Sequence, residues 1–358
     1  MHVLSIRSVS ELTMDFQLEI YFRESWTDYR LIFDPKTYNN LTKIDLDVNV
    51  FLDKIWLPKT FFANSINSND PSPLEPQSTS YKCFLRLHSN GMVQYSRKIS
   101  VTAECPMELV KYPFDQQKCN LEIECYDLTV KGLVYNWKNE DPITLNKLIL
   151  PNFHLTNVSR EAINQSEDSG IYSRLVCTFH LQRLPGFCIT QYFIPGATIV
   201  VVAALLSFIA DTQNPATSSE LMAALLAITF LFNAHSLNMP QVSYVKAMDI
   251  FLATCFFFVF LCLVKHAVWV IQLKQHQNKV IQQDNRLSTT KAVAVQTETN
   301  NGTIQSEVQL CKKKKNFKLK IFADCKKVKM DSVHRHISIL LVALFGFFCL
   351  VFVYIFAL

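Results

Sequence analysis

Four long apolar stretches constrain the fold of this chain more than any other feature. Three follow one another closely, and the fourth ends the sequence: Cys188–Ala210, Leu221–Met239, Ile250–Val264 and His336–Leu358. The third continues beyond Val264 through another apolar segment, AVWVIQL. A helix of about 20 apolar residues crosses a bilayer core of about 30 Å. The sequence therefore predicts four transmembrane helices, which place both ends of the chain on one side of the membrane.

Basic residues indicate which side that is. The segment between the third and fourth stretches contains CKKKKNFKLK and CKKVK, and short cytoplasmic loops carry an excess of Lys and Arg. We therefore expect an extracellular domain over residues 1–187, three helices over 188–272, a cytoplasmic loop over 273–334 and a last helix over 335–358. The Gln/Asn/Thr-rich first half of that loop predicts a disordered linker. Three glycosylation sequons agree with an extracellular N-terminal part, at Asn40, Asn157 and Asn164.

The extracellular part has the pattern of β-strands. Segments such as DFQLEIYF, KCNLEIEC and RLVCTFHLQR alternate apolar with polar residues, and Ser89-Asn90-Gly91 is a hairpin turn signal. Short strands separated by turns predict an all-β sandwich. No helical period of useful length precedes Cys188.

Two cysteines in this part enclose the stretch CPMELVKYPFDQQKC, from Cys105 to Cys119. Redox and zinc motifs place cysteines two to four residues apart and add further ligands, so this spacing fits neither. In an oxidising compartment the pair is expected to form a disulfide that closes a loop, with Pro113 fixing a turn at its tip. The alternative is two unrelated buried thiols.

Enzyme chemistry has no motif to support it. The sequence contains no Gly-rich phosphate loop, metal-ligand cluster or nucleophile elbow, and its histidines lack HExxH spacing. We therefore expect no catalytic residues, no cofactor and no metal, and no nucleic acid among the partners.

Several segments resemble the Cys-loop pentameric ligand-gated ion channels, in particular the branch of glycine, GABA and invertebrate anion channels. They are LTMDF, ESWTDYRL, IWLPKTFFAN, the cysteine loop with its inner YPFD, the FIP of the first apolar stretch and PQVSYVKAMDIF. The resemblance covers nearly the whole chain apart from the cytoplasmic segment. Family members have a signal peptide, a helix and a strand before this point, so the resemblance implies an N-terminally truncated sequence.

The resemblance implies five subunits around a pore, in a homo- or hetero-pentamer, with agonist bound between extracellular sandwiches. One face of the site would carry Phe61, Phe62, Glu124, Tyr126 and Tyr172, and the facing subunit would carry Tyr21, Arg23, Arg86 and Ser96. Tyrosines can hold an ammonium group and an arginine a carboxylate, which suits a small amino-acid-like neurotransmitter. The chain departs from the family at Asp127 and Leu128, where a small and an aromatic residue are usual.

A second disulfide is an open question at this point. The branch usually bridges a cysteine near Tyr172 with one several residues earlier, and the earlier cysteine is missing. A Cys125–Cys177 disulfide and two buried thiols are equally compatible with the sequence.

The second apolar stretch is expected to line the pore, because it alone has polar residues at both ends. Residues spaced alternately by four and three share one helical face: Ser219, Ala223, Leu226, Phe230, Asn233 and Leu237. In the family match this is the pore face, with Leu226 at the hydrophobic gate.

The cytoplasmic mouth of this pore carries opposing signals. Pro215-Ala216 matches the motif of anion-conducting relatives, but Thr217 replaces its arginine and the acidic Glu220 follows. A chloride channel is expected from the branch. A cation channel and a non-conducting accessory subunit remain the alternatives.

The resemblance implies that agonist binding is coupled to the pore where Tyr112, Pro113 and Phe114, at the tip of the cysteine loop, meet the loop Leu237–Tyr244. Asp115 is expected to contact Arg183 nearby. The expected setting is the lipid bilayer of the plasma membrane, including postsynaptic membrane.

Overall fold

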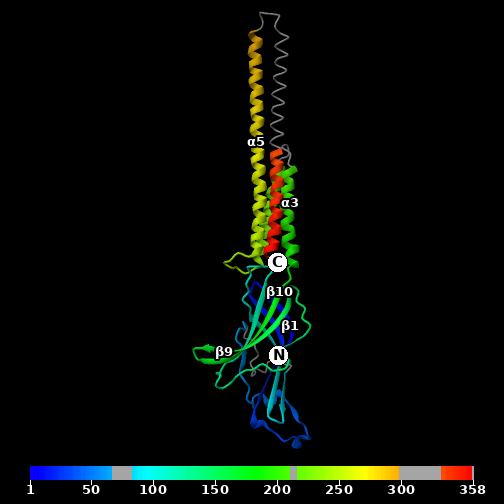
Figure 1. Cartoon of the computed structure of the whole chain (residues 1–358), viewed down its shortest axis with the longest axis vertical. Coiled ribbons are helices and arrows are strands. Elements are labelled where there is room, and N and C mark those ends of the chain that lie inside the picture. The colour runs from blue at the N-terminus through cyan, green and yellow to red at the C-terminus, as the bar shows by residue number, and fades with distance from the viewer. Residues whose placement is uncertain (67–82, 210–215, 298–331, 357–358) are drawn as a thin grey trace. The chain divides into compact units, whose positions relative to one another are not determined.

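A computed structural model describes residues 1–66, 83–209, 216–297 and 332–356. The chain forms two compact units. The first comprises Met1–Phe187 and Asn238–Tyr244, and the second comprises Cys188–Leu237 and Val245–Leu358. The first unit is built from strands and the second from helices (Figure 1).

The first unit contains two sheets. A six-stranded sheet has the order β3-β5-β6-β2-β1-β8, and a four-stranded sheet has the order β4-β7-β10-β9. The strands are β1 (His2–Ser10), β2 (Asp15–Thr27), β3 (Lys43–Leu46), β4 (Thr60–Phe62), β5 (Cys83–His88), β6 (Met92–Glu104), β7 (Gln116–Cys125), β8 (Thr144–Leu145), β9 (Phe153–Glu167) and β10 (Gly170–Arg183). Three short helical elements join them: η1 (Tyr29–Leu31), η2 (Pro35–Tyr38) and α1 (Val48–Phe51).

The core lies between these sheets, and the alternation of β2 shows why. Phe16, Leu18 and Ile20 are fully buried, while the residues between them face the other side of the sheet. From the opposite sheet, Phe179 of β10 meets Phe16 edge to face with ring centroids 5.9 Å apart. Burying each such side chain contributes about 1.5–3 kcal/mol. The odd-numbered residues of β2, which include Tyr21, are thereby left on the outer face.

The predicted hairpin turn is confirmed between β5 and β6. Gly91 has a φ of +80°, and a Cβ atom there would lie 2.6 Å from the carbonyl oxygen of Asp28. Only glycine avoids both the backbone strain and the collision.

Among the described residues, four helices are long and apolar enough to cross a membrane, at Gly186–Ile209, Thr217–Leu237, Ala247–Gln282 and Ser332–Phe356. The first comprises α2 (Gly186–Cys188), the π-helical η3 (Ile189–Phe193) and α3 (Ile194–Ile209), and the next two belong to α4 (Ala216–Leu237) and α5 (Ala247–Thr297). The predicted fold class, a β-sandwich followed by four transmembrane helices, is confirmed.

The prediction of a disordered linker after the third apolar stretch is wrong for the residues of that segment that the structure describes. α5 continues as a helix to Thr297, well beyond the apolar stretch. The Gln, Lys and Arg residues in this extension are good helix formers, so composition alone did not exclude a helix.

Candidate functional site

A pocket lies on the outer face of the six-stranded sheet. It has a volume of about 330 Å³ and is lined by Tyr21, Arg23, Cys83, Phe84 and Ser96. That volume falls within the range of small-molecule sites. Strand pairing builds the pocket, because Ser96 of β6 lies between Arg23 of β2 and Phe84 of β5. Of these residues Cys83 and Phe84 were missed, although the hairpin turn predicts that β5 pairs with β6.

Arg23 is the charged group that this pocket offers to a ligand. Its side chain is exposed, and within the described ranges it forms no hydrogen bond or ion pair. Ser96 beside it is 3% exposed. The guanidinium can therefore donate two parallel hydrogen bonds to a carboxylate without breaking an internal contact.

Arg86, the other predicted arginine, is engaged elsewhere. Its Nε and Nη2 atoms donate to the two carboxylate oxygens of Asp45, at 2.6 and 3.2 Å. The hydrogen bonds from Arg86 lower the pKa of Asp45. The structure does not place Arg86 in the lining of the pocket.

A second group of candidate residues lies on the four-stranded sheet. Phe61 of β4 and Tyr126 after β7 meet edge to face, with ring centroids 6.0 Å apart, and Tyr126 is 76% exposed. Lys59 holds this turn, because its carbonyl oxygen accepts from the Tyr126 N–H at 3.2 Å. Its ammonium group also lies 3.0 Å from Asp127, and the hydrogen bond from Lys59 lowers the pKa of that carboxyl.

Phe62 lies in the core and not with these surface aromatic residues. It is 2% exposed and packs edge to face on Phe22, with ring centroids 5.6 Å apart. Adjacent residues on a strand point to opposite faces, so Phe61 and Phe62 cannot both face a ligand. The sequence match had assigned both to the site.

Glu124 is also withdrawn from the surface. It is 3% exposed, and Nε of Arg174 donates to its carboxylate at 2.6 Å. Arg174 contacts Glu122 at 2.8 Å and Glu167 at 3.3 Å as well. Arg174 was missed by sequence reasoning, although it lies two residues after Tyr172.

Tyr172 lies on β10 close to the β9–β10 turn. Its hydroxyl is 2.9 Å from the hydroxyl of Ser169, and its side chain is half-buried. The structure thus gathers the candidates into two groups on different sheets. Tyr21, Arg23 and Ser96 line the pocket, whereas Phe61, Tyr126 and Tyr172 belong to the four-stranded sheet.

A Cys125–Cys177 disulfide is absent from the described part of the chain, where both residues are buried free thiols. The β7–β10 register places Cys177 opposite Leu121, four residues from Cys125. At about 3.3 Å per residue the two positions are too far apart for a disulfide. Burial raises the pKa of the Cys177 thiol to about 12 and also raises that of Cys125.

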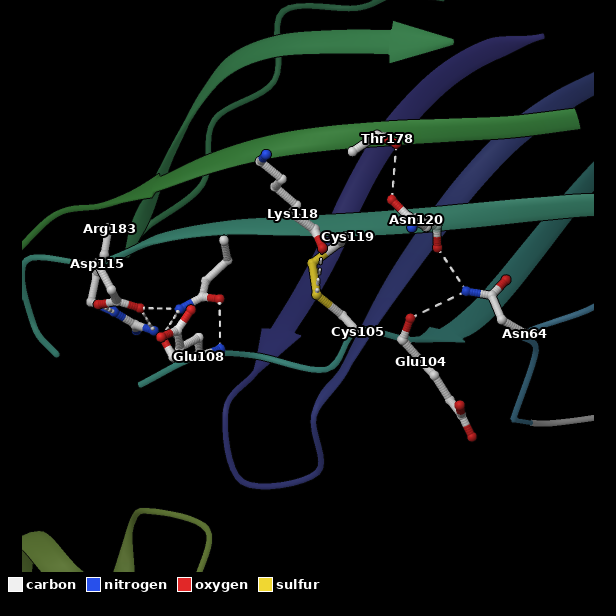
Figure 2. Close-up of a disulfide and its surroundings, with 11 residues drawn as sticks. Asn64, Glu104, Cys105, Glu108, Asp115, Lys118, Cys119, Asn120, Thr178 and Arg183 are labelled. Atoms are coloured by element: carbon white, nitrogen blue, oxygen red, sulfur yellow. Dashed lines mark hydrogen bonds and ion pairs between the residues drawn. A yellow bond between two sulfur atoms is a disulfide. The ribbon is translucent and has the colours of Figure 1, made fainter. Parts of the chain in front are cut away.

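The predicted disulfide between Cys105 and Cys119 is confirmed, with Cα atoms 4.8 Å apart. Both cysteines are fully buried. Figure 2 shows polar contacts on either side of it, including the Asn64 side-chain amide, which donates to the carbonyl oxygens of Glu104 and Asn120 at 3.2 and 2.7 Å. Asn64 therefore joins β6 and β7 beside the disulfide.

The expected contact between Asp115 and Arg183 is present at the other end of this loop (Figure 2). Nε and Nη2 of Arg183 donate to the two Asp115 oxygens at 2.7 and 3.1 Å. Glu11 also accepts from Arg183, and the rings of Tyr112 and Phe153 lie 4.7 and 4.5 Å from the guanidinium. This charge is buried and held by carboxylates and ring faces.

The loop that contributes Asn238–Tyr244 to the first unit reaches the cysteine loop. The Leu109 N–H donates to the Tyr244 hydroxyl at 3.1 Å. Of the predicted coupling residues, Tyr112 and Pro113 are buried and Phe114 is half-buried.

α4 exposes the face predicted to line a pore. All six predicted residues are exposed, with Leu226 at 66%, Phe230 at 74% and Leu237 at 79%. The buried residues of α4 are Thr217, Leu221, Ile228 and His235. At 100° per residue this buried stripe lies about half a turn from the exposed face.

The predicted mouth is only partly described. Pro215 lies outside the described residues, and α4 begins at Ala216. Thr217 is buried and Glu220 is exposed. Glu220 is rotated by about 100° from Ser219, on the flank of the exposed face.

The three sequon asparagines, Asn40, Asn157 and Asn164, are all exposed. Within the parts of the chain that the structure describes, no three His, Cys, Asp or Glu side chains are placed to hold a metal ion.

Comparison with known proteins agrees with this architecture. Residues 1–185 match the neurotransmitter-gated ion-channel ligand binding domain, and residues 192–336 match the neurotransmitter-gated ion-channel transmembrane region. The γ-aminobutyric acid receptor subunit beta-4 of Gallus gallus is 35% identical over 271 residues, which cover 74% of this chain and 53% of that subunit. The chain thus spans about half the length of this relative. The first match lies within the strand-built unit and the second covers mainly the helical unit, and together they establish that the chain belongs to the neurotransmitter-gated ion-channel family.

Proposed function

We propose that this chain is a subunit of a pentameric chloride channel in the plasma membrane, opened by a small amino-acid neurotransmitter bound between neighbouring extracellular domains. The observation that carries the proposal is the separation of the candidate residues into two groups on different sheets. A ligand that contacts Arg23 and also the aromatic group bridges two subunits. Such a site is complete only in an oligomer.

The chemistry of the two groups supports an amino-acid ligand. Arg23 and the Ser96 hydroxyl offer donors to a carboxylate. Exposed Tyr126, with Phe61 against it, offers ring faces to an ammonium group. The name of the Gallus gallus relative makes γ-aminobutyric acid, which carries both charges, the first agonist to test.

Arg23→Ala tests this assignment. We expect the half-maximal concentration of γ-aminobutyric acid to rise about tenfold or more, because a hydrogen bond to a charged group contributes about 1.5–3 kcal/mol. Arg23→Lys keeps the positive charge but cannot donate two parallel hydrogen bonds, so its sensitivity should lie between those of Arg23→Ala and the unmodified chain. Voltage-clamp concentration–response curves measure both variants. An unchanged curve for Arg23→Ala would remove Arg23 from the site.

The exposed face of α4 supports its place at the pore. This helix is apolar enough to cross a membrane, yet only 17% of its apolar segment is buried within one chain. Packed around an axis, copies of this face would form rings of Leu226 and Phe230 side chains. Narrow apolar rings can close a pore by excluding water.

Leu226→Ser is expected to give a resting current without agonist, because a polar ring stays hydrated. Agonist sensitivity should rise about tenfold, which corresponds to roughly 1.4 kcal/mol of bias toward the open state. Leu225→Ser, rotated by about 100° along the same helix, is the matched control and should change neither quantity strongly. Silence at rest together with normal sensitivity in Leu226→Ser would place the gate elsewhere.

Ion selectivity follows from the orientation of Glu220. A carboxylate ring in the ion path would repel chloride, because one charge pair at 4 Å is worth about 4 kcal/mol at an effective dielectric of 20. The flank position of Glu220 supports a place between helices, with chloride as the permeant ion. Glu220→Gln should then raise conductance modestly and leave the reversal potential at the chloride value. Reversal potentials that follow sodium, and lose that dependence in Glu220→Gln, would make this a cation channel.

A further inference from the structure

A chain of hydrogen bonds runs inside the sandwich behind the candidate binding residues. The Thr60 hydroxyl donates to the Glu24 carboxylate, and it lies 2.6 Å from the Tyr135 hydroxyl. Threonine has one hydroxyl hydrogen, so Tyr135 is the donor in the second bond. The Tyr135 N–H in turn donates to the Ser173 hydroxyl at 2.9 Å. We call Glu24, Thr60, Tyr135 and Ser173 the cross-sheet network.

Three of its members adjoin a candidate binding residue on the same strand. Glu24 follows Arg23 on β2, Thr60 precedes Phe61 on β4, and Ser173 follows Tyr172 on β10. Neighbouring residues on a strand point to opposite faces, so these network side chains face inward where their neighbours face outward. Thr60 is 8% exposed and Ser173 is 5% exposed.

We propose that the cross-sheet network couples the two agonist sites that flank one subunit. The inference rests on the proposed function, in which a subunit contributes Arg23 to one interface and Phe61 and Tyr172 to the next. A ligand that shifts β2 at the first interface displaces Glu24, and through Thr60 and Tyr135 it shifts β10 at the second. Coupling of this kind makes agonist binding cooperative.

Two features suit the network to transmission. Its first bond ends on a carboxylate, and charge-assisted bonds of this kind are short and strong. Burial, with the nearby Glu24 charge, raises the pKa of the Tyr135 hydroxyl, which therefore stays protonated and keeps donating. The element that would move is the β9–β10 hairpin, whose end projects from the sandwich (Figure 1) and carries an exposed Ile171.

An agonist-independent experiment tests whether the two ends of the network communicate. Hydrogen exchange of the amides in residues 170–174 is measured on the full chain in lipid nanodiscs for Glu24→Gln, Ser173→Ala and the double variant. If the two ends are coupled, the change in exchange rate in the double variant should differ from the product of the two single-variant changes by about threefold or more. When Thr60→Val is added to the unmodified chain, both single variants and the double variant, the double-variant change should equal the product of the single-variant changes. If the changes in exchange rate multiply in this way while Thr60 is still present, the proposal is overturned.

Agonist cooperativity tests whether that communication joins the two sites. With γ-aminobutyric acid as the probe, Thr60→Val should lower the Hill coefficient toward one, whereas Thr60→Ser, which keeps the hydroxyl, should preserve it. Tyr135→Phe breaks the same link and replaces Thr60→Val if that variant does not reach the surface. An unchanged Hill coefficient in both would overturn the proposal. No current from the unmodified chain, with coupled exchange still present, would contradict the proposed function and leave the network intact.

Discussion

Cys105→Ser is expected to abolish the assembly of this chain at the cell surface. The disulfide to Cys119 is fully buried and closes a loop with a sequence separation of 14. A cross-link of that length stabilises a fold by about 3 kcal/mol, and removal of a native disulfide from a small extracellular domain costs about 2–5 kcal/mol. Since a domain has only about 5–15 kcal/mol in total, this loss leaves a large unfolded fraction.

Surface biotinylation and thermal unfolding of the full chain measure this effect. Cys125→Ser is the matched control, because Cys125 is a buried cysteine of the same sandwich that forms no disulfide. It should reach the surface at near-normal levels. Normal surface density and unchanged unfolding temperature in Cys105→Ser would show that the loop holds its shape without the disulfide.

Arg183→Met should destabilise the extracellular unit by about 3–5 kcal/mol, as removal of one partner from a buried ion pair does. The change leaves Asp115, 4% exposed, without its forked donor. It also removes the guanidinium from between the rings of Tyr112 and Phe153. Because these residues belong to the cysteine loop and β9, loss of the charge should loosen both.

The control for this prediction is Arg30→Met. Arg30 also pairs with an aspartate, Asp28, but its side chain is 78% exposed. Solvent reaches the guanidinium of this pair although the Asp28 side chain is 11% exposed, and surface pairs contribute about 0–1 kcal/mol. The unfolding temperature should therefore change far less than for Arg183→Met. Equal losses of unfolding temperature in Arg183→Met and Arg30→Met would contradict the idea that burial makes the Arg183 ion pair important.

The sequence predicted those features that depend on local pattern. Period-two alternation located β2, the Asn-Gly turn located the β5–β6 hairpin, and long apolar runs located the membrane helices. The helical spacing in α4 separated the exposed Leu226 from the buried Ile228. Each of these signals lies within a window of a few turns or one strand, where side-chain direction follows from geometry.

Features that depend on strand register could not be predicted from the sequence. Cys125 and Cys177 are on paired strands but four residues out of register, and no local pattern reveals that offset. Phe62 was grouped with Phe61 because the family match gave a segment and not a facing direction. The cross-sheet network joins residues far apart in the chain, such as Thr60 and Tyr135, by contacts that only the folded sandwich shows.

The chain is a multi-pass membrane protein of the neurotransmitter-gated ion-channel family with an extracellular N-terminal domain. Beyond that, we propose that it forms an agonist-gated anion pore. To test this, the chain is expressed alone and together with a related subunit. Currents evoked by γ-aminobutyric acid are then recorded under voltage clamp at several external chloride concentrations. We expect a concentration-dependent current whose reversal potential shifts with external chloride by about 59 mV per tenfold change, the value for one elementary charge. A current that reverses independently of chloride, or surface subunits that carry no current in either combination, would contradict it.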